Sequence, residues 1–304
     1  MRKMIYEPFG GLCNRLRNMD YVFQMKNDLN LDDFVLYWYN DRNCGCNLQD
    51  IMLPPVKFKN KPFPKYSIKE CVTQKNIPNL VISTHNNFIH RSIYRKYEHV
   101  FVDDSELEFN YDHFSAELNK YLDENSVVYF RGCHNKTEYR DYSWLKFNQD
   151  LIDKAENWTR DYPNYISLHI RRTDHKLCVL QSPTYVFFDF LDEILKANPH
   201  QFVYLASDDE ELVKQAQEHY QSNMIPHPEF ELSRLTKQGI RDAVVEFLIM
   251  ARSSRIYGSF SSSYSEEAGY YGNIPVEMVT VNNYLDLAKE FVTKNQQTAQ
   301  ESGQ

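Results

Sequence analysis

Two adjacent arginines and a histidine end an apolar run in the second half of the chain, within the hexapeptide HIRRTD of residues 169–174. The run has the composition of a buried strand, so His169 and Arg171 should point to one face and Arg172 to the other. A guanidinium can bind two phosphate oxygens at once, and this strand end therefore predicts an anion site, with Asp174 orienting an arginine. A surface Arg–Asp ion pair gives the same pattern.

Two acidic residues follow the next predicted strand, in the sequence Ser207-Asp208-Asp209. Either carboxylate could accept a hydrogen bond from a hydroxyl of a bound donor. The same residues also suit the start of a helix, with Ser207 and Glu210 as a capping box and the acids interacting with the helix dipole. The sequence leaves both interpretations open.

A serine-rich turn, GSFSSS at residues 258–263, lies between a predicted strand and a predicted helix. Backbone N–H groups at a helix N-terminus bind phosphate without a glycine-rich loop, and the hydroxyls of Ser261, Ser262 and Ser263 would add donors. Serines are also ordinary helix caps, so the turn alone does not decide between the two roles.

Two further places carry polar side chains in unusual settings. Glu246 interrupts the apolar sequence VVEFL of a predicted helix, so it faces water or is buried with a partner. A carboxylate accepts hydrogen bonds from N1–H and N2–H₂ of guanine together. Near the N-terminus, the turn that holds Gly11, Asn14 and Arg15 is predicted to direct its backbone and side chains toward a ligand in a cleft between domains.

The elements that position these residues alternate between strand and helix, which predicts an α/β class with parallel sheets covered on both faces. Ligands then bind at the carboxyl ends of the strands. The predicted strands are Lys3–Pro8, Phe34–Tyr39, Asn79–Thr84, Ser126–Arg131, Tyr165–Ile170, Gln201–Ala206, Arg255–Phe260 and Pro275–Val281. The predicted helices are 12–25, 183–196 (capped by Ser182, with Pro183 as first residue), 207–221, 239–252, 262–271 and 283–294.

Several segments lack such a pattern. Lys57–Tyr66, in which Lys and Pro alternate, is predicted to be a loop. The region 66–123 is irregular, and the polar tail 295–304 is predicted to fray. The length of 304 residues predicts two domains, 1–150 and 151–304, with the crossing within 150–164.

Composition excludes several classes of function. A formal net charge of −8 argues against nucleic acid or an anionic membrane surface as partner. No run of about 18 apolar residues and no signal peptide is found, so we expect a cytoplasmic protein without a transmembrane segment. The chain has neither GxGxxG nor GxxxxGK[ST], which argues against a dehydrogenase or a P-loop enzyme. The six cysteines form no CxxC pair and are expected to be reduced.

Sequence signatures of metal-dependent enzymes are also missing. No two aspartates are separated by a single residue, and HExxH does not occur. The sequence therefore predicts no metal site, and the charge of a departing diphosphate would have to be met by arginines and helix N-termini.

Three segments resemble, in order and approximate spacing, the motifs shared by the GDP-fucose-dependent α1,2-, α1,6- and protein O-fucosyltransferases: HIRRTD (169–174), YLASDD (204–209) and GIRDAVVEFLIMARSSRIYGSFSSSYSEE (239–267). The opening GGLCNRLRNM (10–19) is similar to the N-terminal glycine turn of that superfamily. The likeness is closest to the α1,6 type and its bacterial nodulation-factor relatives. Residues 40–125 carry little of it.

The resemblance implies a GT-B fold, in which two Rossmann-like domains face each other across a cleft. It implies inverting, metal-independent transfer of fucose from GDP-β-L-fucose to a hydroxyl of a glycan or glycoconjugate, with no other cofactor. It places Arg171 on the β-phosphate, His169 beside the nucleotide and Glu246 on guanine. Residues and resemblance together predict catalytic roles for Arg171, Arg172, Asp174 and His175, and donor-binding roles for Gly11, Asn14, His169, Arg171, Asp208, Asp209, Glu246, Ser261, Ser262 and Ser263.

One departure concerns the general base. The α1,6 enzymes carry a glutamate a few residues beyond the first motif, whereas this chain reads HKLCVL at 175–180, without a carboxylate. Inversion needs a group that takes the acceptor's proton. Asp174, His175 or, from the N-terminal domain, Asp20 are the candidates. The aromatic side chain of Trp38 is predicted to stack on a sugar of the acceptor.

Three other functions fit parts of the same pattern. The first is a transferase of the same fold with another GDP-sugar, and the second is a sulfotransferase, which the missing N-terminal phosphosulfate loop disfavours. The third is a non-catalytic protein that binds a sugar or nucleotide. The presence of both Arg171 and Arg172 favours an enzyme, since binding alone needs less stabilisation of charge.

Overall fold

The computed structural model describes residues 1–62, 99–103, 116, 118–122, 127–133, 139–173 and 176–302. The chain divides into two compact units. Unit 1 comprises residues 1–148 and 233–241, and unit 2 comprises 149–232 and 242–304. The predicted division at residue 150 did not include the return of 233–241 to unit 1.

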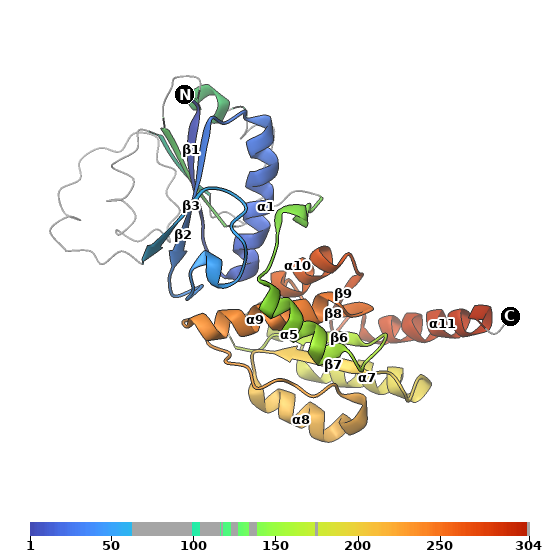
Figure 1. Ribbon diagram of the computed structural model, residues 1–304. Helices are drawn as coiled ribbons and strands as arrows, with labels where there is room; N and C mark the ends of the chain where they lie inside the picture. Colours follow the sequence, from blue (N-terminus) through green and yellow to red (C-terminus); the bar gives the residue numbers. More distant parts are fainter. Residues whose placement is uncertain are drawn as a thin grey trace. The chain divides into compact units, whose positions relative to one another are not determined.

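Unit 1 is built on a parallel sheet with strand order β3-β2-β1-β5-β4. The strand order reverses between β1 and β5. In the described part of the unit the elements are β1 (Lys3–Pro8), α1 (Leu12–Asp28), β2 (Asp33–Asn40), η1 (Leu48–Asp50), β3 (Phe58–Pro62), β4 (His99–Asp103), β5 (Val127–Gly132) and η2 (Tyr142–Trp144) (Figure 1).

Helix α1 packs against this sheet through aromatic and polar contacts. The rings of Phe23 and Phe34 meet edge to face at 6.0 Å, and the hydroxyl of Tyr6 donates to Asn18. The turn before the helix depends on Gly10, which has a φ of +89°. A Cβ there would also lie 2.8 Å from the sulfur of Cys133, so only glycine fits.

Strand β3 was predicted to be a loop, and that prediction is wrong for Phe58–Pro62. Lysine and proline are depleted in strands generally, and their alternation here resembled an irregular segment. However, β3 is an edge strand that pairs only with β2 in the described sheet. Lysines and prolines are common at such edges, because they prevent pairing with another chain.

Unit 2 contains a second parallel sheet, with order β7-β6-β8-β9. Since β7 lies on one side of β6 and β8 on the other, the strand order reverses between β6 and β8. The described elements are α5 (Gln149–Thr159), β6 (Ile166–Ile170), α6 (Lys176–Gln181), α7 (Thr184–Ala197), β7 (Val203–Ser207), α8 (Glu210–Tyr220), η3 (Gln221–Asn223), α9 (Lys237–Ala251), β8 (Arg255–Ser259), α10 (Ser263–Gly272), β9 (Val276–Val279) and α11 (Tyr284–Ser302).

The two faces of this sheet have different roles. Alternate residues of β6, Ile166, Leu168 and Ile170, enter an apolar core formed with α7, α8 and α11. His169 points to the opposite face, where it contacts α10. Tyr204 of β7 also lies on that face and contacts Glu246 of α9. One face therefore stabilises the unit, and the other holds polar side chains at the carboxyl edge.

Details of the helix ends differ from the predictions. Pro183 is the N-cap residue of α7 rather than its first helical residue, and the Ser182 hydroxyl donates to the carbonyl of Val279 instead of capping. The cap of α8 is Asp209 and not Ser207. Helix α11 continues to Ser302, through most of the tail that was predicted to fray.

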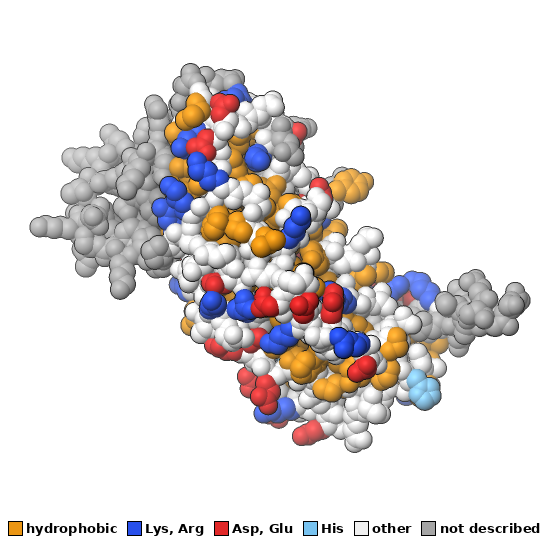
Figure 2. Space-filling view, in the orientation of Figure 1, with side chains coloured by type: hydrophobic (Ala, Val, Ile, Leu, Met, Phe, Trp, Pro, Cys, Tyr) orange, Lys and Arg blue, Asp and Glu red, His pale blue; other side chains and the backbone are white. Residues whose placement is uncertain are grey.

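The predicted strand 79–84 and most of the irregular region 66–123 lie outside the described residues. Within the part of the chain that is described, the helices are all too short or too polar to cross a membrane. On the face drawn in Figure 2, acidic and basic side chains are interspersed among the described residues.

Candidate functional site

Serine hydroxyls connect the carboxyl ends of three adjacent strands in unit 2. Ser259, the last residue of β8, accepts a hydrogen bond from the backbone N–H of Arg171 (3.0 Å) and donates one to the carbonyl of His169 (3.2 Å). Ser207, the last residue of β7, donates to the carbonyl of Ile170 (2.7 Å). These bonds fix the backbone from which the half-buried Arg171 side chain projects, at the edge where the strand order reverses.

Arg172 points to the opposite side, as the strand alternation predicted. Its Nη2 donates to the carbonyl of Ser182 (2.6 Å), between α6 and α7. Its Nε and Nη1 are buried and have no hydrogen-bond partner among the described residues. Burial lowers the pKa of Arg172. Because buried donors without acceptors are costly, an anionic group near Arg172 would stabilise it.

The two acids of the second motif make local contacts. Asp208 accepts hydrogen bonds from the backbone N–H groups of Arg172 (2.6 Å) and Thr173 (3.2 Å) and from the Thr173 hydroxyl. Burial alone would raise the pKa of Asp208, but these bonds outweigh it and the net shift is downward. Asp209 caps α8 by accepting from the N–H groups of Glu211 and Leu212. The predicted contacts of both acids with the donor stay predictions.

His169, two residues before Arg171, is buried, with 5% of its surface exposed. Its Nδ1 lies 3.0 Å from the hydroxyl of Ser265 and 3.4 Å from that of Ser262. Burial, assisted by the nearby charge of Arg171, lowers the pKa of His169 to about 3. The imidazole is therefore neutral at physiological pH and adds no positive charge to the arginines.

Helix α10 begins at the same edge. Its N-cap residue is Ser262, whose hydroxyl makes no capping hydrogen bond, so no side chain of the cap residue covers the first-turn N–H groups. The exposed Ser261 before it has a φ of +56°, a left-handed conformation that costs a non-glycine residue about 1–3 kcal/mol. Strain of this kind is often found at ligand-binding turns.

Close packing between β8 and α10 depends on Gly258. A Cβ at this position would lie 2.8 Å from the Cβ of Ser265. The glycine thus lets the helix approach the strand, which brings Ser265 into contact with His169.

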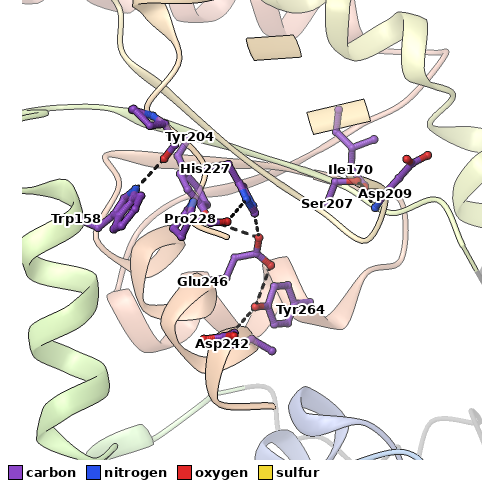
Figure 3. A network of polar contacts seen from close by, with 12 residues as sticks. Trp158, Ile170, Tyr204, Ser207, Asp209, His227, Pro228, Asp242, Glu246 and Tyr264 are labelled. Atoms are coloured by element: carbon purple, nitrogen blue, oxygen red, sulfur yellow. Dashed lines mark hydrogen bonds and ion pairs between the residues drawn. The ribbon is translucent and has the colours of Figure 1, made fainter. Parts of the chain in front are cut away.

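Glu246 is buried within a polar network (Figure 3) and has only 7% of its surface exposed. Its Oε1 lies 3.2 Å from Nε2 of His227 and 3.5 Å from the hydroxyl of Tyr204. Its Oε2 lies 3.3 Å from the hydroxyl of Tyr264. Of the two settings that the sequence left open for this carboxylate, the structure shows the buried one.

Two predicted donor-binding residues belong to unit 1. Gly11 is the N-cap residue of α1, and the Asn14 side chain accepts a hydrogen bond from Arg17 (3.2 Å). Arg15 was predicted to reach a ligand, but its side chain is fully buried. It donates to the carbonyls of Gly10 and Tyr39 and pairs with an aspartate, so its role is structural.

Two predictions for the acceptor side are also not supported by the side-chain positions. Trp38 is fully buried, donates to the carbonyl of Cys46 (2.9 Å) and stacks on the guanidinium of Arg15, so it has no face for a sugar. Asp20 is fully buried as well and accepts from Trp144, Gln24 and a backbone N–H. Burial raises the pKa of Asp20, but its contacts connect α1 to η2 rather than leaving it as a base.

Asp174 and His175, the other candidates for the base, lie outside the described residues. Sequence reasoning missed three residues that the structure brings into the site: Ser265, His227 and Tyr264. Ser265 could have been found from its spacing of three residues from Ser262 on one helix face. His227 lies in an irregular segment that carried no such signal. Among the described residues, no group of three or more His, Cys, Asp or Glu side chains is arranged to hold a metal ion.

No known protein-family model matches the chain, and no curated protein sequence does. Solved structures do resemble it. POFUT1 in complex with GDP-fucose is 9% identical with a TM-score of 0.55, over 91% of this chain and 98% of that one. The α-1,6-fucosyltransferase NodZ, soaked with GDP-fucose, is 12% identical with a TM-score of 0.52, over 89% of this chain and 92% of its own. Another structure of NodZ, from Bradyrhizobium, has a TM-score of 0.52 at 10% identity, over 88% of this chain and 91% of its own.

At these identities the likeness is one of fold. The predicted α/β class with parallel sheets is confirmed, and so is the resemblance that the motifs indicated: the chain has the fold of POFUT1 and of the α-1,6-fucosyltransferase NodZ.

Proposed function

We propose that the chain is an inverting glycosyltransferase of the GT-B type, which transfers fucose from GDP-β-L-fucose to a glycan hydroxyl without a metal ion. The observation that carries the proposal is the position of Arg171. It follows β6 where the strand order reverses, its backbone is held by Ser259, and the uncapped start of α10 lies at the same edge. Parallel α/β sheets bind ligands at this place.

The diphosphate of the donor would bind between Arg171 and the start of α10. The first-turn N–H groups and the hydroxyls of Ser261 and Ser263 supply neutral donors, and the helix dipole adds partial positive charge. Arg171 supplies a full charge in a fork that matches two phosphate oxygens. The buried guanidinium of Arg172 would add positive charge near the carboxyl end of β6.

Guanine would bind at Glu246, on the face of the sheet that carries His169. The carboxylate accepts, and guanine offers two adjacent donors, N1–H and N2–H₂. POFUT1 and NodZ have been solved with GDP-fucose, in agreement with a GDP-sugar as the donor here.

Catalysis would rest on stabilising the charge of the departing GDP. As the bond from the sugar to the β-phosphate breaks, negative charge grows on the diphosphate, and the guanidinium of Arg171 would bind it more tightly in the transition state than in the ground state. The neutral His169 supports the start of α10 through Ser262 and Ser265, and it adds no positive charge of its own. Asp174 and His175 are the remaining candidates for the proton acceptor.

The test is a turnover assay of the purified full chain in EDTA, with GDP release measured for GDP-fucose and GDP-mannose against a panel of glycan acceptors. Acceptor-dependent GDP release from GDP-fucose alone supports the proposal. Release from GDP-mannose instead would identify a transferase for another GDP-sugar. Tight binding of GDP-fucose without release, with or without acceptor, would indicate a non-catalytic binding protein.

A further inference from the structure

His227 is placed so that each of its ring nitrogens faces an oxygen (Figure 3). Nδ1 lies 2.7 Å from the carbonyl of Pro228, and Nε2 lies 3.2 Å from Oε1 of Glu246. The ring stacks in parallel on Tyr204, at 5.7 Å between centroids, and meets Phe230 edge to face at 5.4 Å. Backbone and aromatic contacts thus fix the orientation of the imidazole from three sides.

The hydrogen-bond partners determine where the protons lie. A carbonyl oxygen only accepts, so Nδ1 of His227 must carry a hydrogen. Nε2 faces Oε1 of Glu246 at 3.2 Å, so the fixed ring holds the carboxyl group in one orientation and engages only one of its two oxygens.

The tyrosines leave one carboxylate oxygen available. The Tyr264 hydroxyl has a single hydrogen, and its carbonyl partner, Ala243, is closer than Oε2 of Glu246. When that hydrogen goes to Ala243, Oε2 keeps its acceptor capacity. His227 and Tyr204 both contact the other oxygen, Oε1.

We propose that His227 is a specificity-determining residue, which holds Glu246 as an oriented carboxylate with Oε2 directed to the N1–H and N2–H₂ edge of guanine. The inference rests on the proposed function, since it concerns the same donor site. His227 is a positioning residue, because it acts through Glu246. Through Glu246, His227 would favour a purine base that carries both N1–H and N2–H₂ donors over a purine base that lacks one of them.

The experiment is calorimetric titration of the full chain with GDP and with IDP, whose base lacks the 2-amino group. For the wild type we expect GDP to bind about tenfold more tightly than IDP. This ratio corresponds to the loss of one hydrogen bond between the 2-amino group and a charged acceptor. His227→Phe retains the stacked ring but removes both ring nitrogens and their contacts. We expect it to weaken GDP binding about tenfold to a hundredfold and to bring the GDP-to-IDP ratio close to one. His227→Gln, which retains a neutral donor, should restore part of the preference.

A matched control is His219→Phe, since His219 stacks on Phe188 away from this network. It should leave both affinities unchanged. In the double variant with Glu246→Gln, His227→Phe should add little to the loss from Glu246→Gln alone, because the two residues act as one unit. Thermal melting of each variant checks that it is folded.

The possible outcomes separate the two proposals. A wild type that binds neither nucleotide overturns the proposed function and this inference with it. A wild type that prefers GDP, with a His227→Phe variant that keeps the same GDP-to-IDP ratio, overturns the inference alone. Equal weakening of GDP and IDP binding would show that His227 only supports the fold of its loop.

Discussion

The hydroxyl of Ser262 lies 3.4 Å from Nδ1 of His169, although Ser262 is the N-cap residue of helix α10. A serine at this position ordinarily turns its oxygen onto the N–H groups of its own helix. Here it supports the buried imidazole instead, and the start of the helix is left to other acceptors.

The buried state of His169 predicts how stability depends on pH. Its pKa is about 3 in the folded chain and about 6.5 in the unfolded chain. Between these values the unfolded chain binds more protons, so stability should fall as the pH is lowered from about 6.5, by up to about 1.4 kcal/mol per pH unit, and should not depend on this group above about 7.

Urea unfolding of the wild type and of His169→Asn at several pH values between about 4.5 and 6.5 checks this prediction. The wild type should show the steeper loss of stability. Asp208, whose pKa is also lowered, responds below this window and is present in both proteins. Parallel curves for the two proteins would mean that His169 is not buried as a neutral ring.

Arg171→Ala should lower turnover strongly while leaving the fold intact. The hydrogen bond to Ser259 uses the backbone N–H of Arg171, which alanine retains. The variant loses the preorganised positive charge that stabilises the departing diphosphate, and this loss should lower kcat about 10²–10³-fold. Arg160→Ala, at an exposed position after α5, serves as the control and should retain full activity. An Arg171→Ala variant with wild-type kcat would remove the central residue of the proposed mechanism.

Gly258→Ala should be destabilising because its Cβ would overlap Ser265. Overpacking of this kind costs about 1–3 kcal/mol, measured as the free energy of unfolding in urea. In Gly11→Ala a Cβ would meet no atom within 4 Å, so only the loss of a favourable N-cap residue applies and the cost should be smaller. Adding Ser265→Gly should recover part of the stability of Gly258→Ala. If the single variant is as stable as the wild type, α10 does not pack as closely as described.

Asp209→Ala tests whether this acid binds the donor or only caps α8. Loss of the cap should cost about 1 kcal/mol of stability and leave the affinity for GDP-fucose unchanged. Glu210→Ala, one residue further in the same helix, should cost only a few tenths of a kcal/mol. A drop in affinity specific to Asp209→Ala would instead support the contact with the donor that the sequence predicted.

The fold of unit 2 could be predicted because its strands and helices alternate with clear periodicity. The apolar run that ends at Ile170 and the helix around Val244 each had one dominant pattern. Strand β3 was missed because an edge strand carries the residues that usually mark a loop. The caps of α7 and α8 were assigned one and two residues too early, because the end of a helix is set by local backbone geometry that a sequence pattern defines only to within a residue or two.

The site could be predicted only where its residues lie within continuous motifs. Arg171, His169 and Ser262 come from strand ends and helix starts, which the order of elements brings to one edge. The partner of Glu246 could not be predicted, because His227 reaches it from an irregular segment. Trp38 and Arg15 were misjudged, since sequence alone does not distinguish a buried aromatic–guanidinium stack from a ligand-binding pair.

The most direct test of the proposed donor site is calorimetric titration of the wild-type chain with GDP and with UDP, each in the presence of EDTA. Both nucleotides carry the same diphosphate, so the comparison isolates the guanine contact from the phosphate contact. We expect micromolar binding of GDP and no measurable binding of UDP. Equal affinity for the two, or no binding of GDP, would contradict a GDP-sugar site at the carboxyl edge of β6 and β8.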